Sequence, residues 1–255
     1  MNQAADYLFL HGGGQGSWVW DDLVHALHRQ APAEPGRAVR LDVPGCGTKR
    51  GRDTARLAFS EVVAELVADL DRSGLRGAVA VGHSQAGTLL PFLAARRPEA
   101  IGRLVYLACS LPLPGQTVLE MMGTGLQGAE PERVGWPAAA LGATPRERDR
   151  ALFCNDMTPA QAETFLDRLG ADAWPAASYA ETRWQLEPPP APAHYVICLR
   201  DRVLPVPWQE RFARRLGAHR LVRLDAGHQA MLTRPHALAE ILRLAAAGQL
   251  DAMED

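Results

Sequence analysis

Ser84 lies in a short stretch that could present a serine for nucleophilic attack. The stretch reads GHSQAG over residues 82–87 and stands between an apolar run and a helical pattern. A serine on a sharp turn from strand to helix can be held exposed at the edge of a sheet if its neighbours are small. Ala86 takes a position where glycine is usual, and a serine that begins a helix is otherwise an ordinary N-cap. Ser84 is therefore a candidate nucleophile whose assignment depends on suitable partners.

A serine nucleophile needs a base, and the base needs a carboxylate to orient it. Asp201 follows an apolar run at residues 194–199, and His228 follows another at 220–224. Residues that follow parallel strands meet at one edge of the sheet, where catalytic groups gather. We therefore expect Ser84, His228 and Asp201 to form a catalytic triad.

Other side chains of the same types are weaker candidates. Asp225 stands shortly before His228 and is expected to end its strand instead of orienting the base. Ser110 lacks the turn that an attacking serine requires, and His83 is expected to pack beside the nucleophile. Four further histidines are expected at the surface, on helices or near helix ends: His25, His28, His219 and His236.

A second glycine-rich stretch could stabilise the negative charge that develops during attack on a carbonyl. It reads HGGGQGS over residues 11–17 and follows the first apolar run. Glycines allow backbone N–H groups to turn toward such a charge, as does the N–H of the residue after the nucleophile. We assign Gly13 and Gln85 as the two backbone donors of an oxyanion hole. A phosphate-binding loop is the alternative, but neither Gly-Lys-Ser/Thr nor GxGxxG occurs here.

The elements that must position these residues alternate between strand and helix. Short apolar runs predict strands at residues 7–10, 38–42, 77–81, 104–108, 194–199 and 220–224. Helical patterns predict helices at about 17–29, 85–97, 207–216 and 235–247, and Ser60 is expected to cap one more. This alternation predicts an α/β fold with a doubly wound, mostly parallel sheet.

A helical segment is expected to interrupt the sheet at residues 111–192, between core segments 1–110 and 193–255. Two helices are signalled by Thr144-Pro145 and Thr158-Pro159, each with an acid or amide at N3, and the proline-rich stretch at 188–192 predicts an extended linker. Such a cap would cover the site, with some of its large apolar side chains forming its own core. The expected pocket residues from the cap are Met121, Met122, Trp136, Phe153, Met157 and Trp184. Trp136 could equally pin the cap to the core.

Composition and charge narrow the class of protein. The chain has 255 residues, 47% of them hydrophobic, and a net charge of −2. A chain of this length buries about 75% of the surface that it exposes when unfolded, and its charge argues against nucleic acid as a partner.

The cysteines, Cys46, Cys109, Cys154 and Cys198, lack CxxC spacing, so we expect buried thiols and no metal site. Without a signal-peptide pattern or an 18-residue apolar run, we expect a cytoplasmic protein with no membrane partner.

Together these stretches resemble the α/β-hydrolase superfamily. The resemblance rests on the sequences HGGGQGSWVW at 11–20, DVPGCG at 42–47, VGHS at 81–84, DRVLP at 201–205 and GH at 227–228. Within the superfamily the chain is similar to the compact branch of plant methylesterases, hydroxynitrile lyases and bacterial salicylate-esterase-like proteins. The resemblance spans nearly the whole chain and implies an α/β-hydrolase fold with a helical cap inserted between the sixth and seventh strands of the fold. It also implies the chain order Ser84, Asp201, His228 for the triad.

Two positions depart from the lyases of this branch. Those lyases carry a threonine directly after the first histidine and a lysine directly after the catalytic histidine. Here these positions hold Gly12 and Gln229, so the lyases' own groups are missing. We include Gly12 and Gln229 in the expected substrate pocket.

These observations predict a serine hydrolase, without cofactor, that cleaves a small and largely apolar carboxylic ester, such as a methyl or aryl ester, through an acyl-enzyme. The same residues on this fold can also serve C–C cleavage, decarboxylation or cyclisation of a polyketide-type substrate, because fold and triad do not fix the reaction. A ligand receptor on this scaffold fits less well, since such receptors often lack a member of the triad. Relatives in the branch are commonly dimers, so the resemblance suggests a homodimer, although the sequence itself does not indicate an oligomeric state.

Overall fold

The computed structural model describes residues 4–30, 35–180 and 189–252. Its centre is a six-stranded sheet in the order β2-β1-β3-β4-β5-β6, and every pairing between neighbours is parallel. The strands are β1 (Tyr7–Leu10), β2 (Ala38–Leu41), β3 (Ala78–His83), β4 (Ile101–Leu107), β5 (Ala193–Cys198) and β6 (Arg220–Leu224). The predicted strands are confirmed to within a few residues, and the sheet is wholly rather than mostly parallel.

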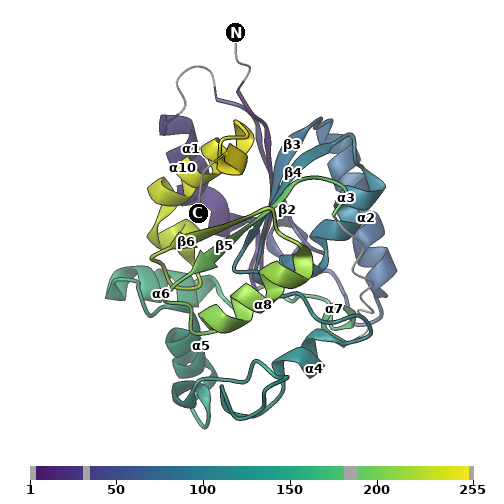
Figure 1. The fold of residues 1–255 in the computed structure, drawn as a ribbon. Coiled ribbons are helices and arrows are strands. Elements are labelled where there is room, and N and C mark those ends of the chain that lie inside the picture. The colour runs from purple at the N-terminus through teal and green to yellow at the C-terminus, as the bar shows by residue number, and fades with distance from the viewer. Residues whose placement is uncertain (1–3, 31–34, 181–188, 253–255) are drawn as a thin grey trace.

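Residues alternate between the two faces of the sheet, and each face is covered by helices (Figure 1). On β1, Leu8 and Leu10 pack with one set of helices, while Tyr7 and Phe9 pack with the other. The first set comprises α2 (Phe59–Ser73), α3 (Leu90–Arg96) and α8 (Val206–Leu216), and the second comprises α1 (Asp21–Gln30) and α10 (Pro235–Ala246). Burial on both faces explains the apolar runs of the central strands.

Three predicted helix starts differ from the structure. The pattern at 17–29 forms a 3₁₀ turn, η1 (Ser17–Trp20), before α1, and the pattern at 85–97 forms η3 (Ser84–Thr88) before α3. Ser60 does not cap α2: Ala58 is the N-cap residue, and its N–H donates to the Glu61 carboxylate at 2.8 Å. The Glu61 carboxylate at N3 therefore caps the start of α2, in place of the expected Ser60 hydroxyl.

A long helical segment separates β4 from β5, and its helices fall within residues 111–192, where a helical insertion was predicted. It contains α4 (Val118–Met122), η4 (Ala138–Ala140), α5 (Pro145–Phe153), α6 (Pro159–Arg168) and α7 (Ala177–Ala180). These cap helices gather at one end of the sheet in Figure 1. Both predicted capping boxes are confirmed, since Thr144 accepts from Glu147 N–H and Thr158 from Gln161 N–H. Part of the predicted linker, Pro188, lies outside the described residues.

Candidate active site

The backbone at Ser84 is strained in the way that an elbow serine requires. Ser84 has φ of 52°, and it shares a positive φ with only one other non-glycine residue in the described segments, Ala108. Such a conformation is costly for a residue with a Cβ and persists where the surroundings impose it. Gly87 permits the tight turn, since a Cβ there would lie 2.6 Å from the Ser110 carbonyl oxygen. Ala86 has no positive φ, which explains why alanine is tolerated at that position.

Ser84, His228 and Asp201 form a continuous hydrogen-bonded chain. His228 Nε2 lies 3.0 Å from Ser84 Oγ, and His228 Nδ1 lies 2.6 Å from Asp201 Oδ2. The other carboxylate oxygen, Asp201 Oδ1, accepts from the N–H groups of Val203 at 2.7 Å and Leu204 at 2.9 Å. These donors fix the carboxylate, which in turn favours the His228 tautomer that carries its proton on Nδ1. Nε2 is then free to accept the serine proton.

The rival candidates lie elsewhere or are otherwise engaged. Asp225 pairs with Arg200 at 2.7 Å, and its side chain is 73% exposed. Ser110 is buried, and its N–H donates to the Ser84 carbonyl oxygen at 3.0 Å. The four surface candidates are all exposed: His25, His28, His219 and His236.

His83 has a larger role than the packing role expected of it. Its Nε2–H donates to the His228 carbonyl oxygen at 2.9 Å, and the two ring centres are 4.6 Å apart. Burial, together with the nearby His228 charge, lowers the pKa of His83 well below its usual value. A neutral His83 therefore holds the backbone of the candidate base. Its position at the end of a wholly apolar strand was the available sequence signal.

The first glycine loop lies directly beside the nucleophile. A Cβ on Gly12 would lie 3.0 Å from Ser84 Cβ, and a Cβ on Gly13 would lie 2.9 Å from Gln85 Oε1. His11 shapes this loop: Nδ1–H donates to the Gly12 carbonyl oxygen at 2.9 Å, while Nε2 accepts from Val43 N–H at 3.2 Å. Burial lowers the pKa of His11 and so favours this neutral form. The two residues expected to stabilise the oxyanion, Gly13 and Gln85, are therefore neighbours.

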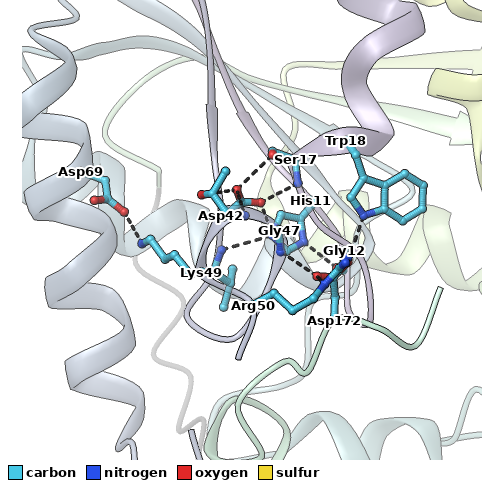
Figure 2. Close-up of polar contacts among 12 residues, drawn as sticks. His11, Gly12, Ser17, Trp18, Asp42, Gly47, Lys49, Arg50, Asp69 and Asp172 are labelled. Carbon is cyan, nitrogen blue, oxygen red and sulfur yellow. Dashed lines mark hydrogen bonds and ion pairs between the residues drawn. The ribbon is translucent and has the colours of Figure 1, made fainter. Parts of the chain in front are cut away.

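Two buried carboxylates tie this loop to its surroundings (Figure 2). Asp42 follows β2 and accepts from Ser17 N–H at 2.6 Å and Thr48 N–H at 2.9 Å. Asp172, from the cap, accepts from Trp18 Nε1 at 2.9 Å, Gly47 N–H at 2.7 Å and the guanidinium of Arg50 at 3.0 Å. Burial opposes ionisation of Asp172, but these hydrogen bonds outweigh it and lower its pKa. Asp172 could not be identified from the sequence, because nothing in its local pattern distinguishes it from a surface aspartate.

The expected pocket residues of the cap have varied surroundings. Met121 and Met122 are buried in the core cluster that contains α2 and α3. Trp136 packs partly buried against the same cluster, and its indole N–H donates to the Gly123 carbonyl oxygen at 2.9 Å. Phe153 lies against the candidate base, with ring centres of Phe153 and His228 5.7 Å apart.

The remaining pocket candidates fall in three different places. Met157 lines a groove of about 370 Å³ between α6 and η1, with Trp18 and Phe165. Gln229 is fully buried, and its amide has no hydrogen-bond partner among the described residues. Trp184 lies outside the described residues. Among the pocket candidates in the described residues, Gly12 lies against the Ser84 side chain and Phe153 lies against the His228 ring.

Neither a metal cluster nor a membrane span emerges from the described part of the chain. No group of three or more His, Cys, Asp or Glu side chains there is arranged to hold a metal ion. No helix in the same segments is long and apolar enough to cross a membrane. The four cysteines are all free and buried, as expected.

Comparison with known proteins gives consistent matches. The model of the alpha/beta hydrolase family matches residues 7–241. Lipase LipV of Mycobacterium tuberculosis is 30% identical over 79% of this chain and 69% of its own length. Polyneuridine aldehyde esterase of Rauvolfia serpentina is 23% identical over 94% of this chain and 95% of its own. A methylesterase structure from Arabidopsis superimposes with a TM-score of 0.74 at 20% identity, covering 96% of this chain and 100% of that one, which shows a shared fold.

Several curated relatives match over part of their length only. The chain spans 35% of putative methylesterase 14 and 62% of putative methylesterase 11, both chloroplastic proteins of Arabidopsis thaliana.

Proposed function

Because this chain belongs to the alpha/beta hydrolase family, we propose that it is a serine hydrolase that cleaves a small, largely apolar carboxylic ester. The observation that carries the proposal is the Ser84–His228–Asp201 chain of hydrogen bonds, at 3.0 and 2.6 Å, on a strained turn. The esterase, lipase and methylesterase names of the relatives support carboxylic esters as the substrate class.

Acylation uses the proton path that the geometry provides. His228 Nε2 takes the Ser84 hydroxyl proton while Oγ attacks the ester carbonyl carbon, and the carbonyl oxygen becomes an oxyanion. The N–H groups of Gly13 and Gln85 donate to that oxygen. Asp201 stabilises the His228 cation, which then gives its proton to the departing alcohol as the C–O bond breaks. The products of this half-reaction are the free alcohol and an acyl group on Ser84 Oγ.

Deacylation repeats the sequence with water. His228 Nε2 takes a proton from a water molecule, whose oxygen attacks the acyl carbon. Collapse of the second tetrahedral intermediate breaks the bond to Ser84 Oγ, and His228 returns the proton to that oxygen. The carboxylic acid leaves, and the enzyme regains its starting protonation state.

The surroundings of the base favour an apolar substrate. Phe153 contacts His228 from the cap, and Phe165 lies behind it with ring centres 6.1 Å apart. Aromatic walls of this kind prefer apolar or aromatic groups. We further propose a cytoplasmic location, where the four buried thiols would stay reduced. Size-exclusion chromatography with light scattering tests the expected homodimer.

Active-site labelling tests the proposed function directly. An organophosphonate should label Ser84, and Ser84→Ala should lose at least about 10³-fold in kcat with an activated ester. Ser110→Ala is the matched control, since Ser110 is a buried serine near the same turn, and it should keep its activity. A burst of acyl-enzyme on Ser84 distinguishes ester hydrolysis from lyase or cyclase chemistry. Labelling of Ser110, or full activity in Ser84→Ala, would refute the assignment.

A further inference from the structure

A segment of the cap lies across the first glycine loop and is anchored along its length. We name residues 172–179 the strap; it follows α6 and runs into α7. Asp172 ties its start to the core through Trp18, Gly47 and Arg50 (Figure 2). The next residue, Ala173, donates its N–H to the Gly45 carbonyl oxygen at 3.0 Å. The start of the strap is therefore held against the loops that follow β1 and β2.

The far end of the strap is held beside the nucleophile. Gln85 Nε2 donates to the Ser178 carbonyl oxygen at 3.3 Å. Trp174 packs edge-on against His11, with ring centres 5.4 Å apart, and also neighbours Tyr179 at 6.5 Å. The strap is thus in contact with both residues that shape the candidate oxyanion hole, His11 from the first loop and Gln85 from the turn.

The Tyr179 hydroxyl occupies the space over Gly13. A Cβ on Gly13 would lie 2.3 Å from the Tyr179 hydroxyl oxygen and 2.9 Å from Gln85 Oε1. A Cβ lies about 2.5 Å from its own backbone nitrogen, so the hydroxyl oxygen is at most about 5 Å from the Gly13 nitrogen. When two donor atoms each lie about 2.9 Å from one shared acceptor, the separation between the two donors is also within about 5 Å. The hydroxyl is therefore within reach of an oxygen that accepts from Gly13 N–H.

This hydroxyl is available as a donor. Within the described part of the chain it makes no hydrogen bond, and the Tyr179 side chain is only partly buried. Burial raises the pKa of Tyr179 above its usual value, so the phenol keeps its proton at any pH suited to an esterase assay. An uncommitted O–H group in this position gains a partner when a carbonyl oxygen binds.

We propose that Tyr179 is a third oxyanion donor, which hydrogen-bonds the carbonyl oxygen of the bound ester together with the N–H groups of Gly13 and Gln85. The inference rests on the proposed function. The bond strengthens as that oxygen gains negative charge in the tetrahedral intermediate, so it lowers the barrier more than it tightens substrate binding. The cap then supplies one of the groups that act on the substrate, and Asp172 is a positioning residue for it.

Tyr179→Phe removes the hydroxyl and keeps the ring, which separates hydrogen bonding from shape. We expect kcat to fall by about 10- to 100-fold with KM changed less than about twofold. The affinity for a trifluoromethyl ketone, which forms a tetrahedral adduct with the serine, should fall by the same factor. Tyr7→Phe is the matched control, because Tyr7 is a buried tyrosine at the start of β1, and it should leave both quantities unchanged.

The melting temperature of each variant and a second substitution distinguish loss of the Tyr179 hydrogen bond from a general loss of structure. Gly13→Ala places a methyl group where the hydroxyl lies, so its loss of kcat and that of Tyr179→Phe should be less than additive in the double variant. Additive losses, or a Tyr179→Phe enzyme with wild-type kcat and ketone affinity, would overturn the proposal for Tyr179 alone. A wild-type protein that neither acylates nor turns over any ester would overturn the proposed function, and this inference with it.

Discussion

Asp201→Asn is expected to remove most of the activity by reversing the direction of one hydrogen bond. In the protein, one Asp201 oxygen accepts from two backbone N–H groups, of Val203 and Leu204, and the other accepts from His228 Nδ1. An asparagine must keep its carbonyl oxygen toward the two backbone donors, because these N–H groups have no other acceptor among the described residues. Its NH₂ group therefore faces His228, and Nδ1 must accept from it.

The consequence reaches the nucleophile through the imidazole. With Nδ1 as an acceptor, the ring proton moves to Nε2, which lies 3.0 Å from Ser84 Oγ. That nitrogen then donates to the serine and can no longer take its proton. Loss of the correct tautomer in a triad of this kind costs roughly 10³–10⁴-fold in kcat, or about 4–6 kcal/mol in activation free energy.

Asp225→Asn provides the matched control. This carboxylate is 73% exposed and pairs with Arg200 at the surface, and such pairs contribute at most about 1 kcal/mol. Its kcat should therefore stay within about tenfold of the wild type. Initial rates with a chromogenic ester, together with the rate of organophosphonate labelling, measure both effects. If Asp225→Asn is the more damaging change, Asp225 orients the base and the tautomer argument fails.

Three further changes test contacts around the triad. Trp136→Ala should lower the melting temperature, because the Trp136 indole N–H donates a hydrogen bond to the Gly123 carbonyl oxygen. It should reduce kcat/KM about equally for an acetate ester and a bulky aryl ester. A loss at least about tenfold greater for the aryl ester would instead place Trp136 at the substrate. Asp172→Asn should lower kcat by about tenfold and make the cap more susceptible to limited proteolysis, because it weakens the buried hydrogen bonds from Gly47 and Arg50. An unchanged kcat and an unchanged rate of proteolysis would show that the strap keeps its position without the Asp172 charge. The free energy of unfolding should fall as pH drops below about 6.5, because burial keeps the folded-state pKa of His83 and His11 below that value and the unfolded chain takes up more protons. Urea denaturation should show a shallower fall in His83→Asn, and a stability that rises with acidity would contradict the argument.

The sheet could be predicted because its signals are local. Each strand is a short apolar run, and the helices between successive runs indicate that neighbouring strands run parallel. The triad candidates were accessible for the same reason, since Ser84 directly follows a strand and Asp201 and His228 stand in the loops that follow two others. The loop position alone placed them at one edge, and the structure brings their side chains into contact.

The contacts between the cap and the core could not be predicted in this way. Asp172 and Gly47 are 125 residues apart in the chain. Asp172 lies outside any helix or strand, and Gly47 begins only a three-residue 3₁₀ turn, η2 (Gly47–Lys49), so no periodic pattern marks either residue. The helix starts in the cap were predictable from capping boxes at Thr144 and Thr158, but capping fixes where a helix begins and not which side chain it delivers to the site. Size and apolarity selected Met157 as a pocket residue, but they could not indicate that it lines a groove beside Trp18.

Glycine at position 13 has two physical explanations, which act together. A small residue allows the backbone N–H to face a developing charge, and this was visible in the sequence. The space that the missing side chain leaves is filled by the Tyr179 hydroxyl, and this was not visible, because Tyr179 lies in a short helix of the cap with no motif around it. A larger side chain at position 13 and a tyrosine at 179 would compete for the same volume. The loop that carries the proposed backbone donors and the cap segment that holds Tyr179 therefore constrain each other, and the identity of a residue in one can be understood only with the other in place.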